Sequence, residues 1–142
     1  MKKSLFIIII IIIIFIFISL AGCGGSYYYN YEDLKETVEK VEIIEITNEG
    51  KTAEDFKLIR ILNDKEMDEL LEELAKVEFI YPFGTPRELS DTGIKMYYSN
   101  EEYEIVSRLA TKRYKDDVEI DWRMRYCSKE DFDNLVSKYL NE

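Results

Sequence analysis

Residues 118–140 read VEIDWRMRYCSKEDFDNLVSKYL and contain two periodicities. Apolar and charged side chains first alternate, which is typical of a β-strand with one apolar face. The apolar set is Val118, Ile120, Trp122, Met124 and Tyr126, and the charged set is Glu119, Asp121, Arg123 and Arg125. Ser128–Asp131 then resembles a capping box before a stripe with helical spacing, Phe132, Leu135, Val136, Tyr139 and Leu140. The stretch therefore predicts a strand followed by a one-sided helix.

The same order, strands and then a helix, is predicted earlier in the chain. Residues 41–46 and 56–62 are predicted as a hairpin around the turn at 48–51. The doubled Ile43-Ile44 breaks the alternation, which indicates either a bulge or burial on both faces. A capping box at 63–66 then precedes an amphipathic stripe, formed by Met67, Leu70, Leu71 and Leu74.

The remaining elements complete the predicted fold. Residues 77–80 are predicted as a short strand, and 94–98 with 103–109 as a second hairpin. Strands joined by short turns form antiparallel sheets, and one-sided helices need a sheet face to cover. We therefore predict an α+β fold, a two-layer sandwich in which two helices cover one face of an antiparallel sheet. Residues 38–142 would form this single domain.

Charge and composition exclude several classes of function. The chain has 142 residues, a net charge of −10 and no histidine. Residues 1–22 contain two lysines and no acidic residue, so the rest carries 17 basic and 29 acidic side chains, a net charge of −12. Nucleic-acid binding requires clustered Lys and Arg, so we expect no nucleic-acid partner. Histidine-based catalytic triads and imidazole-ligated metals are absent from such a chain.

The N-terminus has the layout of an export signal. Lys2 and Lys3 precede the unbroken apolar run 5–18, whose length suits the apolar core of a signal peptide better than a membrane span. The run leads to Leu20-Ala21-Gly22-Cys23. These four residues resemble the lipobox of bacterial lipoprotein precursors. An uncleaved signal anchor with an incidental cysteine is the alternative.

The resemblance implies where the protein resides. It implies that a diacylglycerol is attached to Cys23 and that the chain is cut between Gly22 and Cys23. The signal peptide would then be 1–22, followed by the lipidated Cys23 and a flexible tyrosine-rich tether over 23–37. Two acyl chains give a stable membrane anchor. We therefore expect a protein held by lipid on the extracytoplasmic face of the cell membrane.

The predicted domain also resembles the small hairpin-plus-helix domains of many uncharacterised lipoproteins of Gram-positive bacteria. The shared features are Ile-x-Ile strands, an Asn-Asp-Lys-Glu helix start followed by Leu-Leu-x-x-Leu, and the closing Phe132-x-x-Leu135-Val136 helix. They are generic to such domains. The resemblance implies no activity.

No motif predicts catalysis. A glycosidase would need two carboxyls across a cleft, but Asp116 and Asp117 are predicted as a turn, and Glu119 and Asp121 as the solvated side of a strand. Calcium-loop spacing and glycine-rich phosphate loops do not occur. Cys127 would be a single free thiol without a histidine to activate it. We expect no enzyme activity, no cofactor and no metal.

Binding is the remaining expectation. If the helices cover the Val118 and Trp122 side, the uncovered face would present Tyr97, Arg123 and Arg125 to an envelope protein. The alternative is a small-molecule or peptide site at the Tyr81–Pro86 loop, which contains both prolines of the chain. An envelope enzyme without a recognisable motif is the third possibility.

Overall fold

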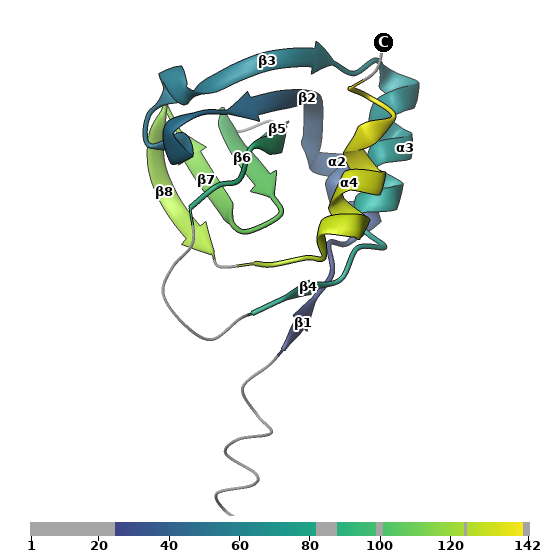
Figure 1. Ribbon diagram of the computed structural model, residues 1–142. Helices are drawn as coiled ribbons and strands as arrows, with labels where there is room; N and C mark the ends of the chain where they lie inside the picture. The colour runs from purple at the N-terminus through teal and green to yellow at the C-terminus, as the bar shows by residue number, and fades with distance from the viewer. Residues whose placement is uncertain (1–24, 82–87, 99–100, 124, 141–142) are drawn as a thin grey trace, which may run out of the picture.

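The computed structural model describes residues 25–81, 88–98, 101–123 and 125–140. Among them are three α-helices, a six-stranded antiparallel sheet and a separate two-stranded sheet. The helices form one layer and the large sheet the other, as Figure 1 shows. The predicted α+β class with an antiparallel sheet is therefore confirmed.

The six-stranded sheet has the order β3-β2-β5-β6-β7-β8, and every neighbouring pair is antiparallel. Its strands are β2 (Val38–Ile46), β3 (Phe56–Ile61), β5 (Thr92–Tyr98), β6 (Glu102–Ser107), β7 (Thr111–Lys115) and β8 (Val118–Arg123). Both predicted hairpins are present. The sequence patterns missed β7 as a separate strand, because its residues Thr-Lys-Arg-Tyr-Lys carry no apolar alternation.

The sheet is curled, so that both of its faces bury side chains. Val41 and Ile43 pack in one cluster with the helices, whereas Ile44 and Ile46 pack in a second cluster on the opposite face. The register between β2 and β3 shifts between Ile43 and Ile44. Burial on both faces therefore accounts for the doubled isoleucine, whereas the extra residue of the bulge, Ile59, lies in β3.

One aromatic contact between distant strands demonstrates the curl of the sheet. Phe56 of β3 and Tyr114 of β7 have ring centroids 5.7 Å apart, although three strands separate β3 from β7 in the sheet. The sheet must therefore bend towards the face that lacks helices. This bend closes the second cluster without a covering layer.

Local signals placed two of the helices correctly. α3 (Asp64–Leu74) begins at Asn63, whose side chain accepts from the Glu66 amide while the Glu66 carboxylate accepts from the Asn63 amide. α4 (Lys129–Ser137) begins at Ser128, which accepts from the Asp131 amide. Their apolar stripes pack against Val41 and Ile43 in the cluster between the helices and the sheet, which we term the helix-side cluster. The stripe residues in it are Leu70, Leu71, Leu74, Phe132, Leu135 and Val136.

The prediction of a flexible tether over residues 23–37 is wrong for residues 26–37. Ser26–Tyr27 forms β1, which pairs with β4 (Phe79–Ile80), and Tyr31–Thr37 forms α2, which contacts α3. Tyr29 and Leu34 are buried in the helix-side cluster. The folded domain therefore begins at residue 26 instead of 38, and it has three helices where two were predicted. The predicted strand at 77–80 is β4, outside the large sheet.

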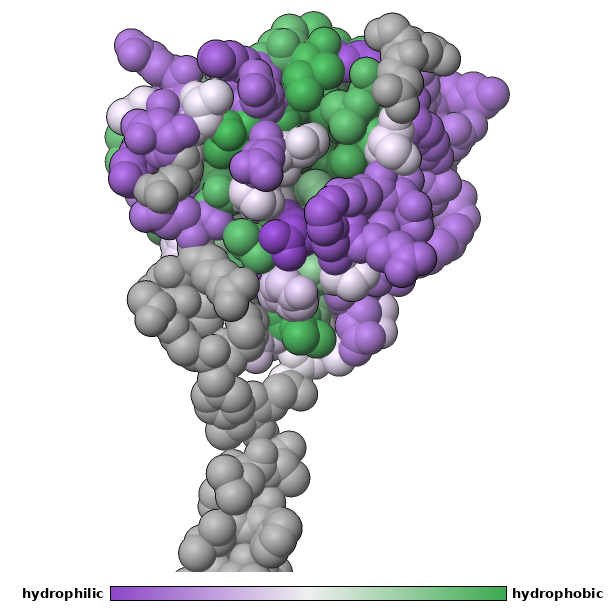
Figure 2. Space-filling model, in the orientation of Figure 1, coloured by the Kyte–Doolittle hydropathy of each residue, from purple (hydrophilic) through white to green (hydrophobic). Residues whose placement is uncertain are grey.

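The last strand is shorter than predicted, and its buried face was predicted wrongly. β8 ends at Arg123, and Val118 is 64% exposed. Asp121 and Arg123 pair across with Arg113 and Thr111 and lie on the helix side of the sheet, while Trp122 lies on the other face. β8 is an edge strand beyond the helices, so no apolar layer selects one of its faces. The opposite edge is similar, since β3 exposes Leu58, Ile59 and Ile61, and Figure 2 shows apolar surface at the end where β3 lies.

Candidate functional site

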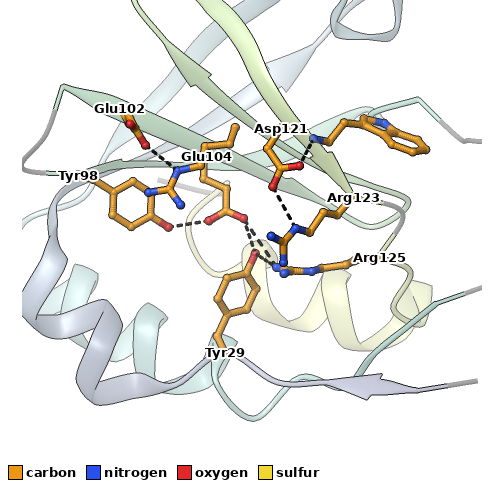
Figure 3. A network of polar contacts seen from close by, with 9 residues as sticks. Tyr29, Tyr98, Glu102, Glu104, Asp121, Arg123 and Arg125 are labelled. Atoms are coloured by element: carbon orange, nitrogen blue, oxygen red, sulfur yellow. Dashed lines mark hydrogen bonds and ion pairs between the residues drawn. The ribbon is translucent and has the colours of Figure 1, made fainter.

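The candidate site is a pocket of about 530 Å³ between the N-terminal segment and the outer half of the sheet. β1, α2 and the residues that join them form one wall, and side chains of β5 to β8 form the other. The lining residues that carry charge are Asp33, Glu104, Arg113, Asp121, Arg123 and Arg125. Three cations therefore face three carboxylates in one cavity, and Figure 3 shows how most of them lie.

Glu104 is the centre of the polar network. It lies on β6 between buried apolar residues and is itself 9% exposed. The hydroxyl of Tyr98 donates to one carboxylate oxygen at 2.6 Å, and that of Tyr29 donates to the other at 3.0 Å. Burial, followed by the adjacent Glu104 charge, raises the pKa of both tyrosines well above the usual range. Both hydroxyls therefore remain protonated donors, and the buried charge of Glu104 is compensated.

Arg125 joins this network to the N-terminal segment. Its guanidinium lies 3.6 Å from the ring centroid of Tyr27, and Nη1 donates to the Tyr29 hydroxyl at 3.2 Å. The same nitrogen is 3.8 Å from Glu104. Burial opposes the charge, but Tyr29, Tyr27 and Glu104 together raise the pKa of Arg125. Arg125 is thus a buried cation held by aromatic faces and one carboxylate.

One nitrogen of Arg125 is buried without a hydrogen bond to any described residue. The buried Nε of Arg125 has no hydrogen-bond partner among the residues that the structure describes. Buried donors are nearly always paired in folded proteins, and an unpaired one costs stability. Such exceptions occur where a water or a ligand completes the site, which makes this cluster a candidate for function.

Two further arginines reach the pocket from β7 and β8. Nε of Arg113 is 2.9 Å from Glu102, and its guanidinium lies 4.8 Å from the Tyr98 ring centroid. Nε of Arg123 donates to Asp121 at 3.0 Å. A guanidinium has five N–H donors in a planar fork. Both arginines line the pocket, where a guanidinium can bind a carboxylate or phosphate in a bidentate manner.

The structure brings together only part of the predicted partner-binding face. Arg123 lines the pocket, but Arg125 is only 3% exposed and cannot contact a partner protein from the surface. Tyr97 lies on the other side of the sheet, since it pairs with Tyr103, which pairs with Tyr114. Tyr97, Arg123 and Arg125 therefore do not form one surface. The error follows from the buried face predicted for β8.

Tyr97 belongs to a polar group on the opposite face. Its hydroxyl donates to Glu42 at 3.0 Å, and the Nζ atoms of Lys40 and Lys95 lie 4.7 and 4.8 Å from its ring centroid. Burial, and then the hydrogen bond to Glu42, raises the pKa of Tyr97. This group is satisfied internally, and it adjoins the second apolar cluster.

The other residues predicted as sites form no second candidate site among the described residues. Tyr81 is partly exposed, whereas the rest of the Tyr81–Pro86 loop, Gly22 and Cys23 lie outside the described residues. Cys127 is buried, and burial raises the pKa of its thiol to about 12, which disfavours the reactive thiolate. Asp116 and Asp117, both with positive φ, form the predicted turn between β7 and β8.

The described part of the chain holds no group of three or more His, Cys, Asp or Glu side chains placed to bind a metal ion. Within the same residues, no helix is long and apolar enough to cross a membrane.

Most pocket residues had no local sequence signal. Tyr29 lies in the stretch that was predicted as a flexible tether. Arg113 lies in β7, whose sequence does not alternate between apolar and polar residues. Glu104 alone offered a hint, because it is a charged residue inside the apolar run Tyr103–Val106. Such a residue indicates either an exposed face or a compensated buried charge, and only the fold distinguishes the two.

The network predicts the effect of removing one hydroxyl. Tyr29→Phe deprives Glu104 of a donor and Arg125 of an acceptor, so we expect the free energy of unfolding to fall by about 1–3 kcal/mol. Tyr28→Phe is the matched control, because Tyr28 is exposed and should change stability by less than about 0.5 kcal/mol. Urea unfolding of both variants measures the difference, and equal stabilities would contradict the network.

No protein-family model, curated protein or solved structure matches this chain. A functional proposal for this chain must therefore start from the residues that line the pocket.

Proposed function

We propose that the protein is a lipid-anchored, extracytoplasmic domain that binds a small carboxylate-bearing molecule in the pocket between its N-terminal segment and its sheet, without catalysing a reaction on it. The observation that carries the proposal is the convergence of Arg113, Arg123 and Arg125 on one cavity. Phosphate is the other anion that suits a guanidinium, and the binding assay below distinguishes it.

The donor and acceptor inventory favours a carboxylate ligand over a cationic one. The carboxylate of Glu104 is already engaged by two tyrosine hydroxyls, and Asp121 accepts from Arg123 and from the Trp122 amide. The acceptor capacity that these two carboxylates keep for an ammonium group is therefore small. The guanidinium groups of Arg113 and Arg123 line the pocket as donors, and tyrosine rings provide apolar faces beside them.

The size of the cavity supports a small molecule. About 530 Å³ lies within the range of pockets that hold drug-sized ligands, about 300–1,000 Å³. The positions of the acidic groups also restrict the ligand. Asp33 and Asp121 would repel a second anionic group near the rim, so a single carboxylate on an uncharged body fits best.

Anchoring is supported by the N-terminal sequence. Leu20-Ala21-Gly22-Cys23 resembles a lipobox at the end of a signal-peptide-like run. The net charge of −12 after residue 22 would disfavour binding to anionic lipid by charge alone. A covalent lipid would provide the membrane affinity that the charge does not.

Anchoring is tested by growth with labelled palmitate. The wild-type protein should incorporate label and migrate at the processed length. Cys23→Ala should lose the label and keep the precursor length, because it lacks the acceptor thiol. Cys127→Ala is the matched control, since it removes the other cysteine of the chain and should keep both label and processing. Label that persists in Cys23→Ala would contradict the lipid anchor.

Ligand binding is tested with the lipoprotein in detergent and a probe panel of acetate, benzoate, succinate and inorganic phosphate. We expect benzoate to raise the melting temperature most, since it combines one carboxylate with an apolar ring. Arg123→Gln should weaken its affinity at least about tenfold, because a charge-assisted hydrogen bond contributes about 1.5–3 kcal/mol. The stability of the free protein should hardly change, since the Arg123–Asp121 pair is exposed.

Lys57→Gln is the matched control, because it removes one positive charge from an exposed residue of β3 that does not line the pocket. It should bind benzoate like the wild type. Equal affinity in Arg123→Gln and Lys57→Gln would contradict the pocket. A response to phosphate alone would replace the carboxylate with a phosphate as the ligand chemistry.

A further inference from the structure

Apolar and aromatic side chains surround the place where the N-terminal segment enters the domain. Tyr28 is 51% exposed, and Ile80 and Tyr81 are each 41% exposed. These three residues, which we term the entry patch, flank the β1–β4 pair. Figure 1 shows that pair at one end of the molecule, with β3 at the other, and Figure 2 shows apolar surface at the β1–β4 end.

The entry patch lies very close to the predicted lipid. The Tyr81 amide donates to the Gly25 carbonyl at 3.4 Å, and a Cβ placed on Gly25 would lie 3.6 Å from the Tyr81 ring. Gly25 is two residues after Cys23, and two residues span at most about 7 Å. The backbone of Cys23 can therefore lie no farther than about 12 Å from the Tyr81 ring.

The short connection cannot hold the domain away from the bilayer. Residues 26–27 are paired with β4, and Tyr27 and Tyr29 are fixed by Arg125. A lipid on Cys23 would thus be joined to a folded body through Gly24 and Gly25 alone. The protein surface around Gly25 must then contact the lipid headgroups of the bilayer.

We infer that the entry patch, Tyr28, Ile80 and Tyr81, lies in the interfacial region of the lipid bilayer and fixes the orientation of the domain on the membrane. This inference rests on the proposed lipid anchor. Tyrosine is enriched at membrane interfaces because its ring is apolar and its hydroxyl remains hydrated. Isoleucine at the same level adds apolar area to the contact.

Charge does not drive this contact. Glu78, which accepts from Ser26, and Asp131 lie near Tyr28 in a neighbouring depression that also contains Lys76. The acidic groups oppose an anionic headgroup layer. The contact must therefore come from the covalent anchor and apolar insertion, and it should persist when salt screens the charges.

The test measures membrane depth with tryptophan in the reconstituted lipoprotein. Trp122 is the only tryptophan, so Trp122→Phe gives a silent background. Tyr81→Trp and, as a second reporter, Tyr28→Trp are placed in this background. Leu58→Trp on β3 is the matched control, because Leu58 is at least as exposed as Tyr28 and Tyr81 but belongs to the strand at the other end of the domain. The vesicles contain phosphatidylglycerol with either ordinary or dibrominated phosphatidylcholine.

We expect brominated lipid to reduce the fluorescence of Tyr81→Trp and Tyr28→Trp at least about twofold, in low and in high salt alike, and to leave Leu58→Trp unchanged. Equal fluorescence of all three reporters in the two lipids would overturn the inference. Flotation of the vesicles separates this failure from failure of the anchor. Protein that floats without quenching contradicts only the orientation, whereas protein that does not float contradicts the anchor and the orientation together.

Discussion

The burial of Arg125 is the interaction on which the rest of the structure depends. Its guanidinium lies between the Tyr27 ring, the Tyr29 hydroxyl and the Glu104 carboxylate. A buried charge is tolerated only when it is paired and hydrogen-bonded, so Tyr27 and Tyr29 must stay in place for Arg125 to stay buried. The cluster thereby fastens the first residues of the domain to its last strands, and it forms the base of the pocket.

This constraint limits how far the domain could lie from the membrane if Cys23 carries the proposed lipid. A tether of about fifteen residues would let a binding domain sample a wide volume above the bilayer. Here the folded domain begins at residue 26, and the wall of the pocket is made by the segment next to Cys23. The proposed ligand pocket and the proposed membrane contact therefore share one structural element. Tyr27 and Tyr29 line the pocket and belong to this segment, so the two proposed properties depend on the same residues.

The sequence predicted what local signals determine and failed where distant residues decide. The caps at Asn63 and Ser128 placed α3 and α4, because capping acts within four residues. α2 has seven residues and one buried apolar side chain, Leu34, so its helix depends on tertiary packing that periodicity does not reveal. Arg125 was predicted to face solvent because it alternates with apolar residues. Its hydrogen-bond partner Tyr29 is 96 positions earlier, so no local pattern reveals the contact. Edge strand β8 lacks a covering layer, and its alternation therefore did not identify the buried face.

Native-state hydrogen exchange of residues 26–38 tests the central claim most directly, namely that the segment after Cys23 is part of the folded domain. The Leu34 amide donates to Asn30, and the Val38 amide donates to Leu34. If Arg125 holds this segment, both amides should exchange as slowly as those of the β2–β5 ladder, through the same global opening. Exchange of both amides at the rate of an unstructured peptide, with the ladder still protected, would contradict the account.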